Sequence, residues 1–518
     1  MQDDVAACGA SPGKNGQVAE LLRQAHERIA RLESENSQLR SGVQQLQGRE
    51  DELLALLNQD PHTALPIRRV FDRDFRKISE DHARRSDVLA VAVLRLDRAY
   101  DRIRNTRDRG KAILFRTAQR IRSAVGDCVY QSDRVDEFLL LLGAVKNERR
   151  VRKITADIVR EISTPHEPPA QDVVFGCHIG VCLYSDGEEE REEILGNAYI
   201  ALEECENFEE SVVVYTNTMG ERYREKQTIE RELRRGMQEG FSEFSIVFQP
   251  FVDRDGKIMG AEALIRWKNR VLGVIPPSRF IPIAEESGDV RFIGQWMLYH
   301  SCKQLASWRE RYGTEIYVSV NISPSQFKQI DLVERVTGIL DAVKLPGSCL
   351  KLELTEGAVM EDPEAAIKRM NELREHDVRI SIDDFGTGYS SLNYLRRLPI
   401  NTLKIDRSFI DDLAANLNNQ EIVKAIISMA HSLRIEALAE GVETRQQLDF
   451  LLTENCNSIQ GFLFSRPVTP TEFDEFLAAG GRIVCCVDDE GQPTEDRESA
   501  AEKQPASDTV SVTKGAAQ

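Results

Sequence analysis

The feature that most constrains the fold is a series of eight short apolar runs between about residues 244 and 484. Each run has the length of a strand, and from the second run onward each is followed by a stretch with helical periodicity. The runs are 246–252, 259–267, 317–323, 349–356, 378–385, 402–409, 435–442 and 458–464. The first two are joined by Asp253-Arg-Asp-Gly256, a hairpin signal, so we expect this pair to be antiparallel. Within an α/β chain, the pattern predicts a (β/α)8 TIM-like barrel with one antiparallel strand.

Polar residues recur at or near the C-terminal ends of these runs. They are Glu262, Asn321, Glu353, Glu356, Asp383, Asp384, Lys404, Asp406, Glu440, Glu443 and Gln460. Active sites of such barrels form at this end, because loops from several strands converge there. Converging carboxylates repel each other unless cations neutralise them, and oxygen ligands without His or Cys favour Mg²⁺ or Mn²⁺. Taken singly, an acid at a strand end is more often solvated or a helix N-cap, so the prediction depends on the whole set.

A heptad repeat occupies residues 18–57. One core position reads Leu22, Ile29, Asn36, Val43, Glu50, Leu57, and the other reads Val18, Ala25, Leu32, Leu39, Leu46, Leu53. The repeat predicts a coiled coil over 17–58, and Asn36 at a core position favours a parallel homodimer. The alternative is a single long amphipathic helix packed on its own domain, although such helices rarely run much beyond ~25 residues.

The remaining segments define the domain organisation. Residues 59–217 alternate apolar strands with polar helices and predict an α/β domain, with strands at 89–96, 129–135, 137–142 and 174–184. A connecting helix over 218–243 leads to the barrel domain at 244–484. We expect disordered tails at 1–16 and 485–518, of which the latter is rich in Asp, Glu, Ser, Gln and Pro.

Charge and hydropathy argue against several classes of protein. Lys and Arg number 67 and Asp and Glu 85, which gives a net charge of −18. Nucleic-acid binding needs a basic surface, so we expect no nucleic-acid partner. No apolar run approaches the ~20 residues that span a bilayer, and no signal peptide is evident, so we expect no membrane association. The ten cysteines form no Cys-x-x-Cys pair, which favours a reducing, cytoplasmic location.

Eight ordered motifs in the barrel segment resemble the EAL domain, the family of cyclic-di-GMP phosphodiesterases. They are Phe248-Gln-Pro250, Glu262-Ala-Leu-Ile-Arg-Trp267, Val320-Asn-Ile-Ser323, Glu353-Leu-Thr-Glu356, Asp383-Asp-Phe-Gly-Thr-Gly-Tyr-Ser-Ser-Leu392, Leu403-Lys-Ile-Asp406, Ala439-Glu-Gly-Val-Glu-Thr444 and Gln460-Gly-Phe-Leu463. The resemblance covers about 220 residues. It implies hydrolysis of cyclic di-GMP to linear pGpG.

The resemblance also implies a site with two metal ions, Mg²⁺ or Mn²⁺. The implied ligands are Glu262, Asn321, Glu353 and Asp383 for one ion, and Asp383, Asp384 and Glu440 for the other. Asp383 would bridge the two ions, an arrangement that suits attack on a phosphodiester.

Other residues take roles in catalysis or substrate binding under the same resemblance. Lys404 would hold and polarise the attacking water, and Glu440 could take its proton. Glu356 would anchor the loop over residues 384–391, and Glu443 is a further catalytic candidate. The substrate-binding candidates are Gln249, Leu264, Arg266, Asp406 and Gln460.

The segment 59–217 is similar to a GGDEF (diguanylate cyclase) domain, with the α/β cyclase fold, but its signature is degenerate. The hairpin that reads Gly-Gly-Asp-Glu-Phe in the family reads Arg134-Val-Asp-Glu-Phe138 here. Gly at these positions lets the backbone approach the nucleotide closely, so Arg134 and Val135 should occlude it.

Three further positions depart from the GGDEF pattern. The Asp-x-Asp that supplies a metal carboxylate in the family reads Arg95-Leu-Asp97, and Ala64 and Ile67 stand where the family has Gly and Asn. We therefore expect no cyclase activity, and GTP remains open as a regulatory ligand of this domain.

Three functional hypotheses remain at this point. The first is a metal-dependent phosphodiesterase regulated by the degenerate domain. The second is a receptor that binds cyclic di-GMP without turnover and signals through the coiled coil. The third is a scaffold that acts through protein contacts. Receptors of this kind typically lack one or more metal ligands, and every expected ligand is present here, which favours the enzyme.

Overall fold

The computed structural model describes residues 13–82, 88–97, 107–145, 148–165, 175–184, 191–207, 210–386, 392–413 and 416–483. The chain divides into two compact units, Met1–Glu225 and Lys226–Gln518. The predicted tails at 1–16 and 485–518 lie outside the described residues, except that residues 13–16 already belong to the first helix. Across the described part of the chain, no helix is both long enough and apolar enough to span a membrane.

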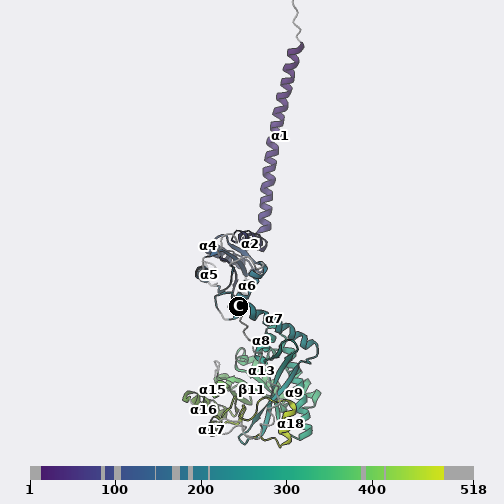
Figure 1. Cartoon of the computed structure of the whole chain (residues 1–518), viewed down its shortest axis with the longest axis vertical. Helices are drawn as coiled ribbons and strands as arrows, with labels where there is room; N and C mark the ends of the chain where they lie inside the picture. Colours follow the sequence, from purple (N-terminus) through teal and green to yellow (C-terminus); the bar gives the residue numbers. More distant parts are fainter. Residues whose placement is uncertain are drawn as a thin grey trace, which may run out of the picture. The chain divides into compact units, whose positions relative to one another are not determined.

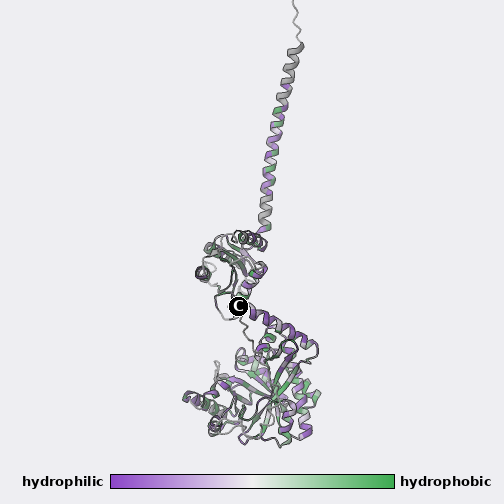
Figure 2. Cartoon of the chain, viewed as in Figure 1, coloured by the Kyte–Doolittle hydropathy of each residue, from purple (hydrophilic) through white to green (hydrophobic). Residues whose placement is uncertain are grey.

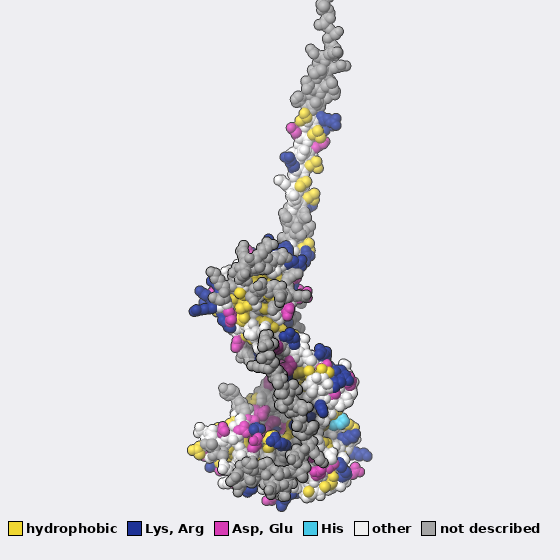
Figure 3. Space-filling view, in the orientation of Figure 1, with side chains coloured by type: hydrophobic (Ala, Val, Ile, Leu, Met, Phe, Trp, Pro, Cys, Tyr) yellow, Lys and Arg dark blue, Asp and Glu magenta, His cyan; other side chains and the backbone are white. Residues whose placement is uncertain are grey.

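The first helix, α1 (Gly13–Asn58), covers 46 residues (Figure 1). Its described heptad side chains lie open to solvent: Ile29, Leu32, Leu39, Val43 and Leu46 are each more than half exposed. Figure 3 shows hydrophobic and charged side chains together on the surface of the described part of this helix. The helix ends at Asn58, and the Asp60 carboxylate then accepts the backbone N–H groups of His62 and Thr63 in a tight turn.

The rest of the N-terminal unit is a five-stranded sheet covered by helices on both faces. The strand order is β2-β3-β1-β4-β5, and the strands are β1 (Val88–Leu96), β2 (Val129–Gln131), β3 (Glu137–Val145), β4 (Cys177–Tyr184) and β5 (Val212–Val214). Along β1, Ala90, Ala92 and Leu94 pack with α4 (Arg107–Val125) and α5 (Glu148–Ser163). The intervening Leu89, Val91 and Val93 pack with α2 (Arg68–His82) and α6 (Arg191–Asn207), as the two-residue period of a strand requires.

In this unit, two predicted strands are shorter than expected, and one strand was not predicted. The strand expected at 129–135 stops at Gln131, because its side-chain amide donates to the carbonyl oxygens of Arg134 and Glu137 and closes the hairpin loop there. The strand expected at 174–184 begins at Cys177, and β5 has only three residues, too few for a pattern in the sequence.

The helix α7 (Asn217–Gln238) extends into the C-terminal unit. We expected residues 218–243 to be a connecting helix only. Instead, Ile229 and Leu233 are buried in the core of the C-terminal unit, and Arg235 forms an ion pair of 2.9 Å with Glu243. The unit therefore begins near Lys226 rather than at residue 244.

The C-terminal unit is a closed barrel. Its strands follow the order β6-β14-β13-β12-β11-β10-β9-β7-β8, and β6 also pairs with β7 and closes the ring. They are β6 (Phe244–Val252), β7 (Ile258–Asn269), β8 (Gly273–Ile275), β9 (Tyr317–Asn321), β10 (Leu350–Thr355), β11 (Arg379–Phe385), β12 (Thr402–Ile405), β13 (Glu436–Ala439) and β14 (Ser458–Ile459). β6 runs antiparallel to both neighbours, and the turn into β7 places Gly256 at a positive φ of 77°.

Helices surround these strands (Figure 1). The longer ones are α8 (Pro277–Ser287), α9 (Val290–Tyr312), α11 (Leu332–Val343), α13 (Pro363–Glu375), α16 (Leu417–Ser432), α17 (Arg445–Thr453) and α18 (Pro470–Ala478). The short ones are α10 (Pro324–Phe327), η1 (Gly347–Cys349), α12 (Glu356–Met360), α14 (Leu392–Leu395) and α15 (Arg407–Asp411). Hydrophobic residues concentrate on the central strands (Figure 2).

The interior of the barrel is polar, whereas the layer between strands and helices is apolar. On β10, Leu350, Leu352 and Leu354 join the hydrophobic core. The alternate residues Lys351 and Glu353 are equally buried, at 1% exposure, and make polar contacts across the barrel. The Lys351 ammonium donates to the Thr402 hydroxyl at 2.6 Å. This alternation places charged side chains inside the barrel and directs Glu353 toward the candidate site.

Candidate active site

The centre of the candidate site is the Lys404 side chain, which is 1% exposed. Its ammonium lies 2.7 Å from Glu353 Oε2 and 3.2 Å from Asp383 Oδ1. It is in direct contact with Glu440 Oε1 and lies 3.9 Å from Glu262 Oε2. Four carboxylates from four different strands or strand ends therefore surround one cation.

The alternation of side chains along β12 explains why Lys404 points inward. Its neighbours Leu403 and Ile405 are fully buried in the hydrophobic core outside the barrel, so Lys404 must face the interior. β12 lies between β11, which carries Asp383, and β13, which Glu440 follows. Parallel strands end at the same edge, and the acids at their ends meet there.

The charge of this cluster is unbalanced. Burial alone would lower the pKa of Lys404, but the four carboxylates outweigh burial and raise the pKa well above its usual value, so the ammonium stays protonated. Burial raises the pKa of the Glu353 and Glu440 carboxyls, and the Lys404 charge only partly opposes this rise. One ammonium cannot neutralise four carboxylates, which favours binding of additional cations.

A chain of side-chain amides orients Glu262. Asn321 donates its amide to Glu262 Oε1 at 2.7 Å, and Gln460 donates to Glu262 Oε2 at 2.8 Å. Gln460 also donates to Gln249 Oε1 at 3.0 Å, and Gln249 in turn donates to the carbonyl oxygen of Ser465. Gln249 and Gln460, which we expect to contact substrate, are both buried, and Gln460 joins Gln249 to the Glu262 carboxylate.

Asp384 and Glu356 shape the loop beside the cluster. Asp384 adopts a left-handed backbone with φ of 55°, which is unfavourable for a residue with a side chain. Glu356 Oε2 accepts the backbone N–H of Gly386 at 3.1 Å and so anchors the start of the loop. The rest of the predicted loop, residues 387–391, lies outside the described residues.

Two further predicted residues make contacts outside the set of carboxylates around Lys404, although Asp406 also contacts Asp384. Asp406 caps α15 by accepting the N–H of Ser408 at 3.0 Å. Glu443 forms an ion pair of 2.9 Å with Arg407. We did not predict this partner of Glu443. The available signal was Gly441, which has a φ of 67° and lies so close to the Arg407 side chain that a Cβ there would not fit.

Arg266 and Leu264 project from β7 next to Glu262. The half-buried Arg266 guanidinium donates to the carbonyl oxygen of Ile265, and burial lowers its pKa. Leu264 lines an apolar cavity of about 260 Å³ that also contacts Asn321 and Glu353. Other parts of its wall, Glu285, Met297 and Gln326 among them, come from helices and were not predicted, because their spacing resembles that of ordinary helix packing.

The residues present fit divalent cations. All the candidate donors are oxygens, as Mg²⁺ and Mn²⁺ prefer. Glu353 Oε1 is buried and accepts no hydrogen bond from the described residues. Within the described residues, no group of three or more Asp, Glu, His or Cys side chains is arranged to hold a metal ion. The carboxylates instead point toward the Lys404 ammonium.

Comparisons with known proteins agree with the two-unit organisation. Residues 230–467 match the EAL domain, and residues 57–210 match the diguanylate cyclase GGDEF domain. The chain is 34% identical over 450 residues to cyclic di-GMP phosphodiesterase NbdA of Pseudomonas aeruginosa, covering 86% of this chain and 57% of NbdA. It is 34% identical over 423 residues to the bifunctional diguanylate cyclase/cyclic di-GMP phosphodiesterase MucR of the same organism, covering 80% and 61%.

A solved structure of the PaMucR phosphodiesterase in complex with c-di-GMP is 40% identical to this chain, with a TM-score of 0.46. The match covers 48% of this chain and 99% of that one. The chain spans only 57% and 61% of the lengths of the two curated relatives. The matches to the two family models show that the chain belongs to the EAL-domain family and that its EAL domain is preceded by a GGDEF domain.

Proposed function

We propose that this chain is a phosphodiesterase that hydrolyses cyclic di-GMP to linear pGpG with two divalent cations, Mg²⁺ or Mn²⁺. The observation that carries the proposal is the cluster of four carboxylates around Lys404 at the C-terminal ends of the barrel strands. The names of NbdA and MucR, both cyclic di-GMP phosphodiesterases, support the choice of substrate. All the expected ligands are present, which disfavours a receptor without turnover.

The cluster separates into two sets of ligands. Glu262, Asn321, Glu353 and Asp383 would hold one cation, and Asp383, Asp384 and Glu440 the other. When bound, two such cations neutralise the phosphodiester and lower the pKa of the attacking water. The amides of Asn321 and Gln460 keep the Glu262 carboxylate turned toward the site.

Lys404 and Glu440 have separate roles in the hydrolysis. Lys404 carries a proton, so it donates a hydrogen bond to the attacking water and orients it rather than removing a proton. Glu440 touches Lys404 and is the acceptor for the proton that the water loses. Water adds to phosphorus, the P–O bond to one ribose 3′ oxygen of the ring breaks, and that oxygen takes up a proton, so that a linear dinucleotide results.

The substrate needs contacts beyond the metal ligands. Arg266 is half-buried beside Glu262 and, among the described residues, forms no ion pair with a carboxylate, so its guanidinium is available for a phosphate. Leu264 contributes an apolar surface next to Asn321. Asp406 and Glu443 act mainly on the local backbone and on Arg407, and we assign them supporting roles.

We also propose that the chain acts in the cytoplasm as a homodimer through α1, with a GGDEF domain that regulates but does not catalyse. The exposed heptad side chains of α1 support the dimer, because a surface helix with such a stripe gains by burying it against a second copy. The Arg134 and Arg95 substitutions support the absence of cyclase activity.

The decisive experiment measures conversion of cyclic di-GMP by the purified full chain with Mg²⁺ or Mn²⁺, followed by chromatography for pGpG. We expect product with either ion, none with EDTA, and none from Glu262→Gln. The control variant Glu364→Gln makes the same chemical change at an exposed residue paired with Arg397 and should keep full activity. Binding of cyclic di-GMP without product in every condition would instead establish the receptor hypothesis.

A further inference from the structure

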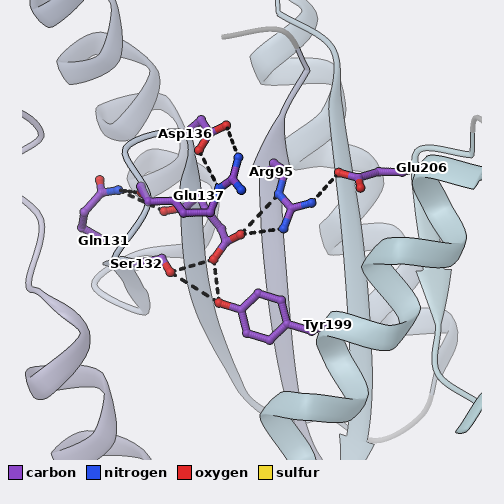
Figure 4. Close-up of polar contacts among 8 residues, drawn as sticks. Arg95, Gln131, Ser132, Asp136, Glu137, Tyr199 and Glu206 are labelled. Carbon is purple, nitrogen blue, oxygen red and sulfur yellow. Dashed lines mark hydrogen bonds and ion pairs between the residues drawn. The ribbon is translucent and has the colours of Figure 1, made fainter. Parts of the chain in front are cut away.

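The N-terminal unit holds a second buried carboxylate, Glu137 on β3, whose side chain is 2% exposed (Figure 4). Glu137 Oε1 accepts hydrogen bonds from the Tyr199 hydroxyl at 2.6 Å and the Ser132 hydroxyl at 2.7 Å. Glu137 Oε2 accepts Arg95 Nη2 at 2.9 Å and Nε at 3.3 Å. A carboxylate offers about four acceptor positions, and all of them are filled here.

Arg95 connects Glu137 to a second carboxylate. Its Nη1 lies 2.7 Å from Glu206 Oε1 on α6, while the rest of the guanidinium faces Glu137. The Arg95 side chain is 23% exposed. One guanidinium therefore bridges two acids from different elements and ties β1, β3 and α6 together (Figure 4).

The divalent cation that a GGDEF domain implies does not fit this arrangement. Glu137 has no acceptor position left, and the carboxylate expected at residue 95 is replaced by a positive group. A cation placed here would meet the Arg95 charge at close range and would have to displace four existing hydrogen bonds. The Ser132 and Tyr199 hydroxyls, which could otherwise serve as oxygen ligands, already donate to Glu137.

We propose that Arg95 is a built-in replacement for the metal ion of the GGDEF domain. Its guanidinium pairs with both Glu137 and Glu206 and holds the hairpin of β2 and β3 in its folded geometry without any added cation. The N-terminal unit is then a metal-independent fold, whereas the C-terminal unit carries the metal chemistry. Magnesium levels would change the activity of one unit and leave the structure of the other unaffected.

The test is hydrogen–deuterium exchange of the full chain with and without Mn²⁺, followed in peptides from β1 and β3. In the wild-type chain we expect the exchange of these peptides to be the same with and without Mn²⁺. Arg95→Asp leaves three carboxylates facing each other, so exchange without metal should rise about tenfold. Mn²⁺ should reverse this rise, because the variant has the oxygen ligands but lacks the built-in cation.

The control is Arg134→Asp, the same charge change in the loop between β2 and β3. The Arg134 side chain is 59% exposed and pairs with Asp136 rather than Glu137. We expect no change in the exchange of β1 or β3 and no dependence on Mn²⁺. Arg95→Met removes the charge without adding an acid and should also raise exchange. It tests the role of the Arg95 charge independently of whether Arg95→Asp folds.

Three results would overturn the proposal. They are protection of the wild-type β1 and β3 peptides by Mn²⁺, unchanged exchange in both Arg95 variants, and failure of Mn²⁺ to restore protection in a folded Arg95→Asp chain. Peptides from β10 to β12 provide a separate readout in the same samples. They should gain protection with Mn²⁺ in every variant, and their failure to do so would count against the proposed phosphodiesterase site, not against the role of Arg95.

Discussion

At the scale of single residues, Lys404 has the clearest expected effect on catalysis. Lys404→Ala should lower kcat at least about 100-fold and change KM little, because a group that orients the attacking water acts mainly on the transition state. The variant should also lose about 3–5 kcal/mol of metal-free stability, since four acids lose their buried counter-charge. Steady-state kinetics and urea unfolding followed by tryptophan fluorescence measure the two effects.

A matched control for Lys404 is available inside the same barrel. Lys351 is equally buried, but its ammonium contacts Thr402 and Tyr317. Lys351→Ala should destabilise the barrel and leave kcat of the folded enzyme near the wild-type value. If Lys404→Ala raises only KM, Lys404 is a binding residue and its proposed role is wrong.

Ala64 is a second informative residue, because its backbone is left-handed with φ of 56°. The turn keeps the conformation that suits the glycine of the family pattern, although the residue is alanine. Ala64→Gly should therefore stabilise the N-terminal unit by up to about 1 kcal/mol. Unfolding followed by circular dichroism is the suitable measurement, because the tryptophans Trp267, Trp296 and Trp308 all lie in the other unit.

The comparison for Ala64 is an alanine in ordinary helical geometry. Ala112 is exposed on α4, and Ala112→Gly should destabilise the same unit by about 1 kcal/mol. Opposite signs for the two substitutions are the expected outcome. Destabilisation by Ala64→Gly would show that the left-handed backbone costs the alanine little.

At the scale of elements, we expect α1 to determine assembly. The full chain should be a dimer at micromolar concentration by light scattering, and a chain beginning at Asp60 should show weaker association. Leu39→Glu should disrupt the dimer because it places a charge in the heptad core. Gln38→Glu adds the same side chain outside the core positions and should leave the dimer intact. A monomeric full chain would contradict the coiled coil.

The hairpin between β2 and β3 is the second element with a definite prediction. Arg134→Gly with Val135→Gly should produce no diguanylate cyclase activity, even though it clears the backbone for a nucleotide. Arg95 still donates its hydrogen bonds to the Glu137 carboxylate, so we expect this carboxylate not to bind the metal ion that phosphoryl transfer requires. The assay incubates the variant with GTP and Mg²⁺ in a Glu262→Ala background, where product is not consumed. Formation of cyclic di-GMP would show that only the hairpin blocks the reaction.

The sequence predicts which segments form strands more accurately than it predicts the residues at which those strands begin and end. The barrel strands and the antiparallel start of the barrel follow from apolar runs and from the Asp253–Gly256 turn. The three-residue strands β5 and β8 are too short to leave a pattern. The early end of β2 depends on Gln131, whose amide finds its acceptors only after the hairpin has folded.

At the scale of the whole molecule, the boundary of the C-terminal unit can be tested by truncation. A chain beginning at Asn217 contains all of α7 and should unfold cooperatively. A chain beginning at Phe244 loses Ile229 and Leu233 from the core, at a cost of about 3–6 kcal/mol for two buried aliphatic side chains. Urea unfolding followed by tryptophan fluorescence compares them. Equal stability would place α7 outside the unit.

The sequence by itself determined the order of the domains, the strands of the barrel and the set of polar residues at their ends. These features are local, because alternation, helical periodicity and turn residues act over a few neighbouring positions. The heptads of α1 and the degenerate hairpin can be recognised in the same way. None of this requires knowing which distant residues meet.

Only the tertiary structure decided the partners of the polar side chains. Lys404 and Glu353 are 51 positions apart, and Gln460 and Glu262 are 198 apart. Strand alternation shows that a side chain faces the interior, but closure of the barrel selects what it meets there. The same holds for Arg95, which lies 42 positions from Glu137. In the sequence, Arg95 is a residue that stands where the GGDEF pattern has a metal-binding Asp. The pairing of β1 with β3 places its guanidinium beside Glu137, in the position that we propose it takes over from the metal ion.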